Sequence, residues 1–275
     1  MTDHNIETGT PQLLAGFSEG VFTLTMHRPE ARNALTFEML DAMSRQLARA
    51  EADKNVRCVV LTGAGNGFCA GGDVKAMIDP SSEDHPGDDP DNHVVRQRLA
   101  QRGTAGRLFH MPKPTLAVIN GPAAGAGLAL ALACDLRLMS SDAALTTAFS
   151  RVGLPGDFGG TYFMTQMIGV ARSRELFFLP DLISAEKAVD LGLVNWKCAP
   201  ERLADETRHI SHRLATGPSI AYRYMKENLN RAVTAGVDEC LDLEASYHVH
   251  CMSSVDHREA ATAFVEKRTP VFVGA

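Results

Sequence analysis

The spacing of apolar positions in the first sixty residues predicts two strands, a helix and a third strand. Apolar runs flank Ser18-Glu19-Gly20, so residues 12–26 read as two short strands joined by a turn. Apolar positions three and four residues apart predict an amphipathic helix over 37–52, with Thr36 as its N-cap. The β-branched run at 56–61 predicts a buried strand.

Strands and helices alternate through the middle of the chain. A helix is predicted over 94–108, and strands are predicted over 116–119 and 136–139. The segment between these two strands ends in an almost wholly apolar stretch, 128–134, which is typical of a buried helix. This alternation indicates a layered α/β core.

Beyond residue 200 the strand signals stop and only helical patterns remain. Residues 201–234 and 237–268 predict two long helices with apolar faces, which favour association between copies of the chain. The pattern is broken at Gly217-Pro218 and at Gly236. The chain therefore divides into two predicted regions, a core over 1–200 and a helical region over 201–275.

Composition narrows the classes of partner. The 275 residues carry a net charge of −6, which argues against nucleic-acid binding, because that needs a basic surface. The six cysteines include no C-x-x-C pair and the histidines form no metal-binding pattern, so we expect reduced thiols and no metal. The start of the chain is polar and no apolar run could span a bilayer, so we expect a cytoplasmic protein.

Two glycine-rich loops carry the candidate chemistry. Each follows a buried strand and leads into a helix, within 59–74 and within 118–135. Small residues leave the backbone N–H groups at a helix start open to an anionic group. Two such loops could offer two donors to one carbonyl oxygen, as in an oxyanion hole. The alternative is that the glycines only allow strand, turn and helix to pack tightly.

These two loops are among the segments in which the chain resembles the crotonase superfamily of enoyl-CoA hydratases and isomerases. The resemblance implies a ββα spiral core with a C-terminal helical trimerisation region, and trimers or dimers of trimers. It also implies acyl-CoA thioester substrates and no cofactor, since coenzyme A is part of the substrate. Six segments carry it in the family's order: 27–35, 67–73, 119–127, 151–163, 185–195 and 263–272.

The resemblance also assigns site residues. It makes the N–H groups of Gly72 and Ala126 the oxyanion donors. It implies that coenzyme A runs between the loops of 27–35 and 67–73 and meets the nucleotide-binding residues of a neighbouring subunit. Arg32 and Lys267 suit phosphate, although Lys267 could equally be a solvated lysine at a helix end. The implied substrate-binding residues are Ala31, Arg32, Ala70, Gly72, Phe149, Phe264 and Lys267.

The carboxylates decide the reaction. Hydratases of the family use two, and this chain has Ala129 and Phe149 in their places, neither of which can transfer protons. Asp157 remains nearby, in a glycine-rich loop before a helix predicted to begin near Thr161. It could be an N-cap or a catalytic base, and an apolar lining that includes Phe149 and Phe158 would raise its basicity.

We therefore expect an isomerase in which Asp157 moves a proton between two carbons of an acyl-CoA held in the oxyanion hole. The same machinery suits a ring-opening or ring-expansion of an arylacetyl-CoA derivative. Two alternatives stay open: a hydratase with an unrecognised base, and a non-catalytic acyl-CoA-binding protein. The acidic segment 79–93 predicts a mobile surface loop, which the resemblance places where a lid would lie.

Overall fold

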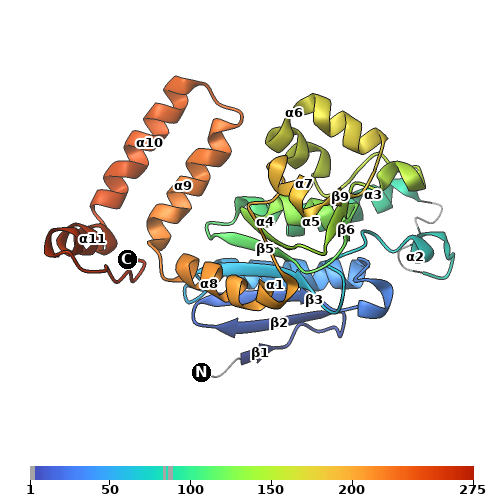
Figure 1. Ribbon diagram of the computed structural model, residues 1–275, viewed down its shortest axis with the longest axis horizontal. Helices are drawn as coiled ribbons and strands as arrows, with labels where there is room; N and C mark the ends of the chain where they lie inside the picture. Colours follow the sequence, from blue (N-terminus) through green and yellow to red (C-terminus); the bar gives the residue numbers. More distant parts are fainter. Residues whose placement is uncertain (1–3, 83–84, 86–88) are drawn as a thin grey trace.

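A computed structural model describes residues 4–82, 85 and 89–275 (Figure 1). Within these residues the main sheet has seven strands in the order β1-β2-β3-β4-β5-β7-β10, and a small sheet has the order β6-β8-β9. The strands are β1 His4–Ile6, β2 Leu13–Ser18, β3 Val21–Met26, β4 Cys58–Gly63, β5 Thr115–Ile119, β6 Ala123–Ala124, β7 Leu136–Ser140, β8 Ala144–Thr146, β9 Ile183–Ser184 and β10 Trp196–Cys198.

The predicted hairpin and strands are confirmed. β2 and β3 pair antiparallel across a two-residue turn, and Glu19 and Gly20 both have positive φ (50° and 82°), as a type I′ hairpin turn requires. From β3 onwards the strands run parallel: β3, β4, β5, β7 and β10. The predicted third strand begins two residues late, at Cys58.

The main sheet lies between two apolar layers, because side chains alternate along each strand. On β4, Val59 and Leu61 join the larger core, which includes α1 and α5. Cys58 and Val60 face the other way and pack with side chains of α8 such as Ile210. The carboxyl ends of these parallel strands lead into the glycine-rich loops.

The helices follow the predicted pattern, with differences at their ends. Thr36 caps α1, its hydroxyl accepting from Met39 N at 3.1 Å, as predicted. The helix predicted over 94–108 is longer and winds wider over Arg102–Gly106, as a π-helix. In the first two-thirds of the chain the helices are α1 Phe37–Ala52, α2 Val74–Ile78, α3 Pro90–Gln101, α4 Arg107–His110, α5 Ala126–Ala133, α6 Gly160–Phe178 and α7 Ala185–Asp190.

The segment predicted as a mobile loop, 79–93, is only partly described. Residues 83, 84 and 86–88 lie outside the described residues. The end of the segment is helical rather than loop, because Pro90 occupies the first turn of α3 and the Asp89 carboxylate accepts from Asn92 N at 3.1 Å. Whether the segment acts as a lid stays a prediction.

The C-terminal region has more helices than predicted within the described residues: α8 Leu203–Ala215, α9 Ser219–Ala232, α10 Val237–Met252 and α11 Val255–Glu266. The predicted breaks occur, and a further one falls at Ser253-Ser254, where the Ser254 hydroxyl caps α11. α8 packs on the sheet, whereas α9, α10 and α11 extend away from it (Figure 1). The boundary at residue 200 stays a prediction.

Candidate active site

The two glycine-rich loops lie against each other at the carboxyl ends of β4 and β5. Ala124 N donates to the Cys69 carbonyl at 2.9 Å, and a methyl group built on Gly71 would lie 3.5 Å from Ala126 N. Packing is tighter still at Gly127, where a methyl group would lie 2.4 Å from the Cys69 carbonyl oxygen. The glycines therefore do allow close packing, and that packing brings the two predicted donors to one place.

The N–H groups of Gly72 and Ala126 are available to a ligand. Leu35 bonds to the residues on either side of Gly72: its N–H donates to Gly71 O at 2.8 Å, and its carbonyl accepts from Asp73 N at 3.1 Å. Successive N–H groups of an extended chain point to opposite sides, so the Gly72 N–H points away from Leu35. Ala126 is the first residue of α5, and neither N–H donates a hydrogen bond within the described part of the chain.

Two asparagines, which the sequence analysis did not single out, fix the loop that precedes these donors. Asn33 is fully buried and donates to the carbonyls of Ala64 and Gly67, at 2.9 and 2.8 Å. Asn120 donates to the carbonyls of Gly63 and Gly65, both at 2.9 Å. Both asparagines stand in segments that carried the family resemblance, but nothing in the local pattern indicated which backbone groups they bind.

Asp157 lies in a loop of unusual backbone conformation. Gly156, Phe158 and Gly159 have φ of 125°, 46° and 76°, a region that costs a non-glycine residue such as Phe158 about 1 kcal/mol or more. α6 begins at Gly160, one residue earlier than predicted, with Gly159 as its N-cap. The interpretation of Asp157 as an N-cap is therefore wrong, because no side chain caps this helix.

The environment of the Asp157 carboxyl makes it more basic than an exposed aspartate. Its Oδ1 atom is buried and has no hydrogen-bond partner among the described residues. Burial raises the pKa of Asp157 from 3.8 to about 6. A carboxylate of that pKa is still ionised at neutral pH and accepts a proton more readily than an exposed aspartate.

Ala129 and Phe149, which the resemblance places at the positions of the hydratase carboxylates, adjoin the start of α6. A methyl group built on Gly160 would lie 3.2 Å from the Ala129 Cβ and 3.8 Å from the Phe149 ring. Phe149 and Ala129 are both buried. The structure thus brings Ala129, Phe149 and the Asp157 loop together, and Asp157 is the acidic side chain of the three.

Phe177 is a neighbour that the sequence analysis missed. Its ring stacks on Phe149, with centroids 5.7 Å apart and planes 11° from parallel. α6 is broken at Gly169 (φ 76°, ψ 165°), so its second half does not continue the direction of the first. The signal in the sequence was this glycine inside a helical pattern.

Cys69 is not a nucleophile in this site. Burial and, to a lesser extent, the nearby Asp157 carboxylate together raise the pKa of its thiol to about 12. A thiol of that pKa stays protonated at neutral pH. Within the described residues, no three His, Cys, Asp or Glu side chains gather where they could hold a metal ion.

The predicted coenzyme A residues divide into two groups. Ala31, Arg32 and Ala70 lie together, since Ala70 N donates to Arg32 O at 3.0 Å, and the Arg32 side chain is exposed. Phe264 on α11 and Lys267, the residue after this helix, are exposed by contrast, and Figure 1 places α11 on the opposite side of the molecule from α2. A single copy does not bring both groups to one site.

Arg28 and Asp73 are engaged with each other. Arg28 pairs with the Asp73 carboxylate at 3.0 Å and also donates to Ala34 O. The Asp73 carboxylate caps α2 by accepting from Ala76 N at 3.2 Å. Asp73 therefore has a structural role, as the cap of α2 and the partner of Arg28.

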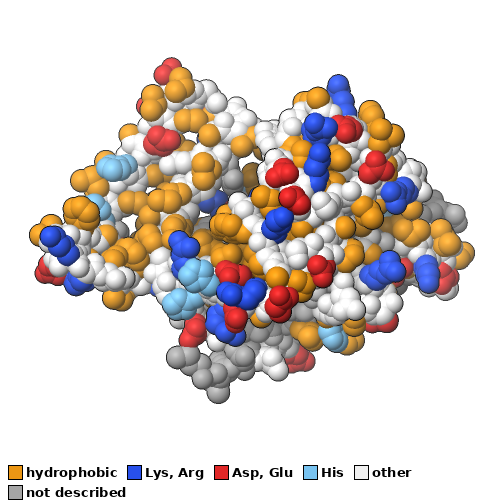
Figure 2. Space-filling view, in the orientation of Figure 1, with side chains coloured by type: hydrophobic (Ala, Val, Ile, Leu, Met, Phe, Trp, Pro, Cys, Tyr) orange, Lys and Arg blue, Asp and Glu red, His pale blue; other side chains and the backbone are white. Residues whose placement is uncertain are grey.

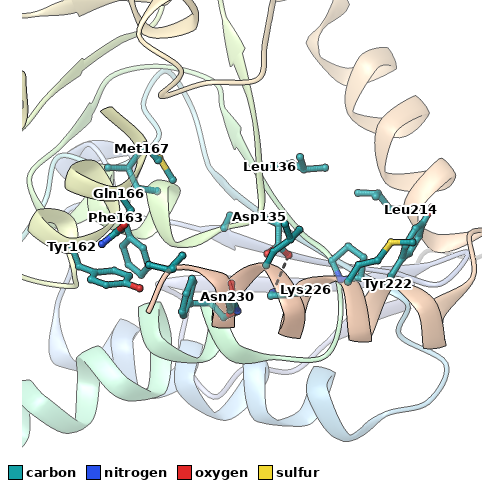
Figure 3. Close-up of a pocket in the computed structure, with 17 residues that line it drawn as sticks. Asp135, Leu136, Tyr162, Phe163, Gln166, Met167, Leu214, Tyr222, Lys226 and Asn230 are labelled. Atoms are coloured by element: carbon teal, nitrogen blue, oxygen red, sulfur yellow. Dashed lines mark hydrogen bonds and ion pairs between the residues drawn. The ribbon is translucent and has the colours of Figure 1, made fainter. Parts of the chain in front are cut away.

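A cavity of about 380 Å³ lies between α6 and α9 (Figure 3), and none of the predicted site residues lines it. Its walls are mostly apolar, with a buried ion pair of Lys226 and Asp135 at 2.9 Å. Lys226 also donates to the carbonyls of Leu108 and Lys113, at 2.8 and 3.2 Å. All three N–H groups are used, so Lys226 ties α9 to the core and has none free for a ligand.

Comparison with known proteins agrees with this fold. The family model "Enoyl-CoA hydratase/isomerase" matches residues 16–275. The 1,2-epoxyphenylacetyl-CoA isomerase of Escherichia coli is 38% identical over 95% of this chain and 98% of its own. The short-chain-enoyl-CoA hydratase of Clostridium acetobutylicum is 32% identical over 90% and 92%.

Among solved structures, an enoyl-CoA hydratase from Polaromonas sp. JS666 superposes with a TM-score of 0.88 at 30% identity, covering 95% of this chain and 99% of that one. The expected crotonase fold is therefore confirmed. Among the described helices, none combines the length and apolar character needed to span a bilayer. The chain belongs to the enoyl-CoA hydratase/isomerase family, whose members act on acyl-CoA thioesters.

Proposed function

We propose that this enzyme is an enoyl-CoA isomerase in which Asp157 is the single base. The observation that carries the proposal is a buried Asp157 carboxyl oxygen without a hydrogen-bond partner among the described residues, in a loop that adjoins Ala129 and Phe149 rather than two further carboxylates. A reaction that adds water needs a group to deprotonate that water. A proton shift within the substrate needs only one group that takes the proton and gives it back.

The proposed reaction keeps every atom of the substrate. The N–H groups of Gly72 and Ala126 bind the thioester oxygen, and the Asp157 carboxylate removes a proton from C2 of a 3-enoyl thioester. The electron pair moves into a dienolate whose negative charge rests on the bound oxygen, where each donor is worth about 3 kcal/mol. Protonated Asp157 then gives the proton to C4, which leaves the double bond between C2 and C3.

An aromatic acyl group is a second candidate substrate. It is favoured by the 38% identity to an isomerase of 1,2-epoxyphenylacetyl-CoA, whose substrate is also an acyl-CoA thioester. The stacked rings of Phe149 and Phe177 beside the Asp157 loop would suit a flat acyl group.

We also propose that the working form is a trimer or a dimer of trimers. Exposed hydrophobic side chains gather on α10 and α11 (Figure 2), and Phe264 is 85% exposed in a single copy. Burying such a surface favours association. In a trimer Phe264 and Lys267 of one copy could reach the coenzyme A held by Arg32, Ala31 and Ala70 of the next.

The test uses purified protein in deuterated water with trans-3-enoyl-CoA, trans-2-enoyl-CoA and 1,2-epoxyphenylacetyl-CoA, followed by mass spectrometry. We expect wild type to isomerise the 3-enoyl or the epoxy substrate. Asp157→Asn should lose about 100-fold or more of that rate. Asp142→Asn, at an exposed aspartate, is the matched control and should keep it.

Two results would contradict the proposal. Addition of water to the 2-enoyl substrate, undiminished in Asp157→Asn, would mean that the enzyme is a hydratase with another base. Tight binding of all three thioesters without any reaction would mean that the protein only binds acyl-CoA.

A further inference from the structure

The second half of α6 returns to the loop that its first half leaves. In an unbroken helix, Gly160 and Phe177 would stand about 26 Å apart, at 1.5 Å per residue. Instead, a methyl group built on Gly160 would lie 3.8 Å from the Phe177 ring. The break at Gly169 explains the difference, because it lets the chain fold back on itself.

The rings of Phe177 and Phe149 cover both flanks of Asp157. On the side before it, a methyl group built on Gly156 would lie 3.2 Å from Phe177 Cε1. On the side after it, one built on Gly160 would lie 3.8 Å from each ring. Phe149 also reaches the oxyanion loop, 3.6 Å from a methyl group on Gly125. Phe149 thus contacts both the Asp157 loop and the oxyanion loop, and Phe177 stacks on its ring.

No ion pair accounts for the state of Asp157. Burial is the cause of its raised pKa, and the titratable group described as interacting with it is the Cys69 thiol, which is neutral at assay pH. The apolar side chains around the loop therefore determine how far water reaches the carboxylate. Phe149 is one of these apolar side chains, and the ring of Phe177 stacks on it and holds it in place.

We propose that Phe177 is a positioning residue, which holds Phe149 against the Asp157 loop and keeps water away from the carboxylate. This rests on the proposed function in one respect, that Asp157 is the base. The enolate formed beside it would then be protonated by Asp157 rather than by solvent.

The first test needs no substrate. The ionisation of Asp157 is followed by infrared titration of its carboxyl band, with Asp157→Asn as the blank, in wild type, Phe177→Leu and Phe177→Ala. We expect a midpoint near pH 6 in wild type, lowered by about one pH unit in Phe177→Ala and by less in Phe177→Leu. Phe178→Ala is the matched control, because Phe178 is adjacent on α6 but 72% exposed.

The second test follows the reaction in deuterated water. We expect Phe177→Ala to lower kcat about tenfold at unchanged KM and to raise the deuterium content of the product. If Phe177 only stabilised the fold, its variants would unfold at lower temperature but keep the wild-type midpoint and deuterium content, and the proposal would be wrong. Should Phe177→Ala not fold, Phe177→Leu decides by the same two measurements. If wild type itself isomerises nothing, the proposed function fails, while the infrared titration still tests the role of Phe177.

Discussion

Replacing Asp157 by asparagine should make the protein more stable at neutral pH. Because burial raises the pKa of this carboxyl in the folded state, the native protein binds more protons than the unfolded chain between about pH 4 and 6. Stability from this group is therefore present at low pH and is lost as the pH rises through that window. A rise in pKa from 3.8 to about 6 corresponds to about 3 kcal/mol at pH 8. Asparagine has no charge to desolvate, so the variant escapes this loss.

The assay is urea unfolding of wild type and Asp157→Asn at pH 4 and pH 8, at one fixed protomer concentration. An unpartnered asparagine amide costs about 1–2 kcal/mol at both pH values. The informative quantity is therefore how much the stability difference between variant and wild type changes from pH 4 to pH 8. We expect that change to be about 2.5 kcal/mol in favour of the variant, because a small part of the effect is already present at pH 4, whereas Asp142→Asn should show almost none. A difference that does not vary with pH would refute the assignment of Asp157 as a desolvated carboxyl.

Two packing predictions concern the surroundings of the site. Gly127→Ala should lose about 1–3 kcal/mol in urea unfolding, since the new methyl group would overlap the Cys69 carbonyl; unchanged stability would mean that α5 can shift away from the loop. Lys226→Met should lose about 3–5 kcal/mol, because it leaves Asp135 without its cation and the Leu108 carbonyl without its donor. A stable Lys226→Met protein would show instead that the ion pair is replaceable by an apolar side chain.

The local sequence was enough to predict those elements that depend only on neighbouring residues. The turn at Glu19-Gly20 and the cap at Thr36 follow from residue types that act on their immediate neighbours. The site was also partly predictable, because strand–loop–helix units bring loops to the carboxyl edge of a parallel sheet. Ala129, Phe149 and Asp157 do meet there.

What was missed depends on contacts between distant residues. Phe177 lies 20 positions beyond Asp157, and only the backbone turn at Gly169 brings it back. The break at Ser253-Ser254 was also missed, although a serine can cap a helix as well as lie within one. In both cases the residue that breaks the helix, Gly169 or Ser254, is visible in the sequence. Only tertiary packing determines whether the helix is broken there.

Main-chain hydrogen bonds hold the loops that carry the proposed oxyanion donors, Gly72 and Ala126. Side chains around these loops can therefore change while the backbone bonds stay. Leu35 fixes the segment around Gly72 through its own N–H and carbonyl, and the N–H of Ala124 joins the two loops by donating to the Cys69 carbonyl. Mutation of a neighbouring side chain leaves these bonds intact. An ancestral enzyme could therefore change its catalytic acids and bases one at a time and still bind the thioester oxygen. One backbone arrangement could in this way serve both hydratases and isomerases, and both kinds of enzyme occur among the relatives of this chain.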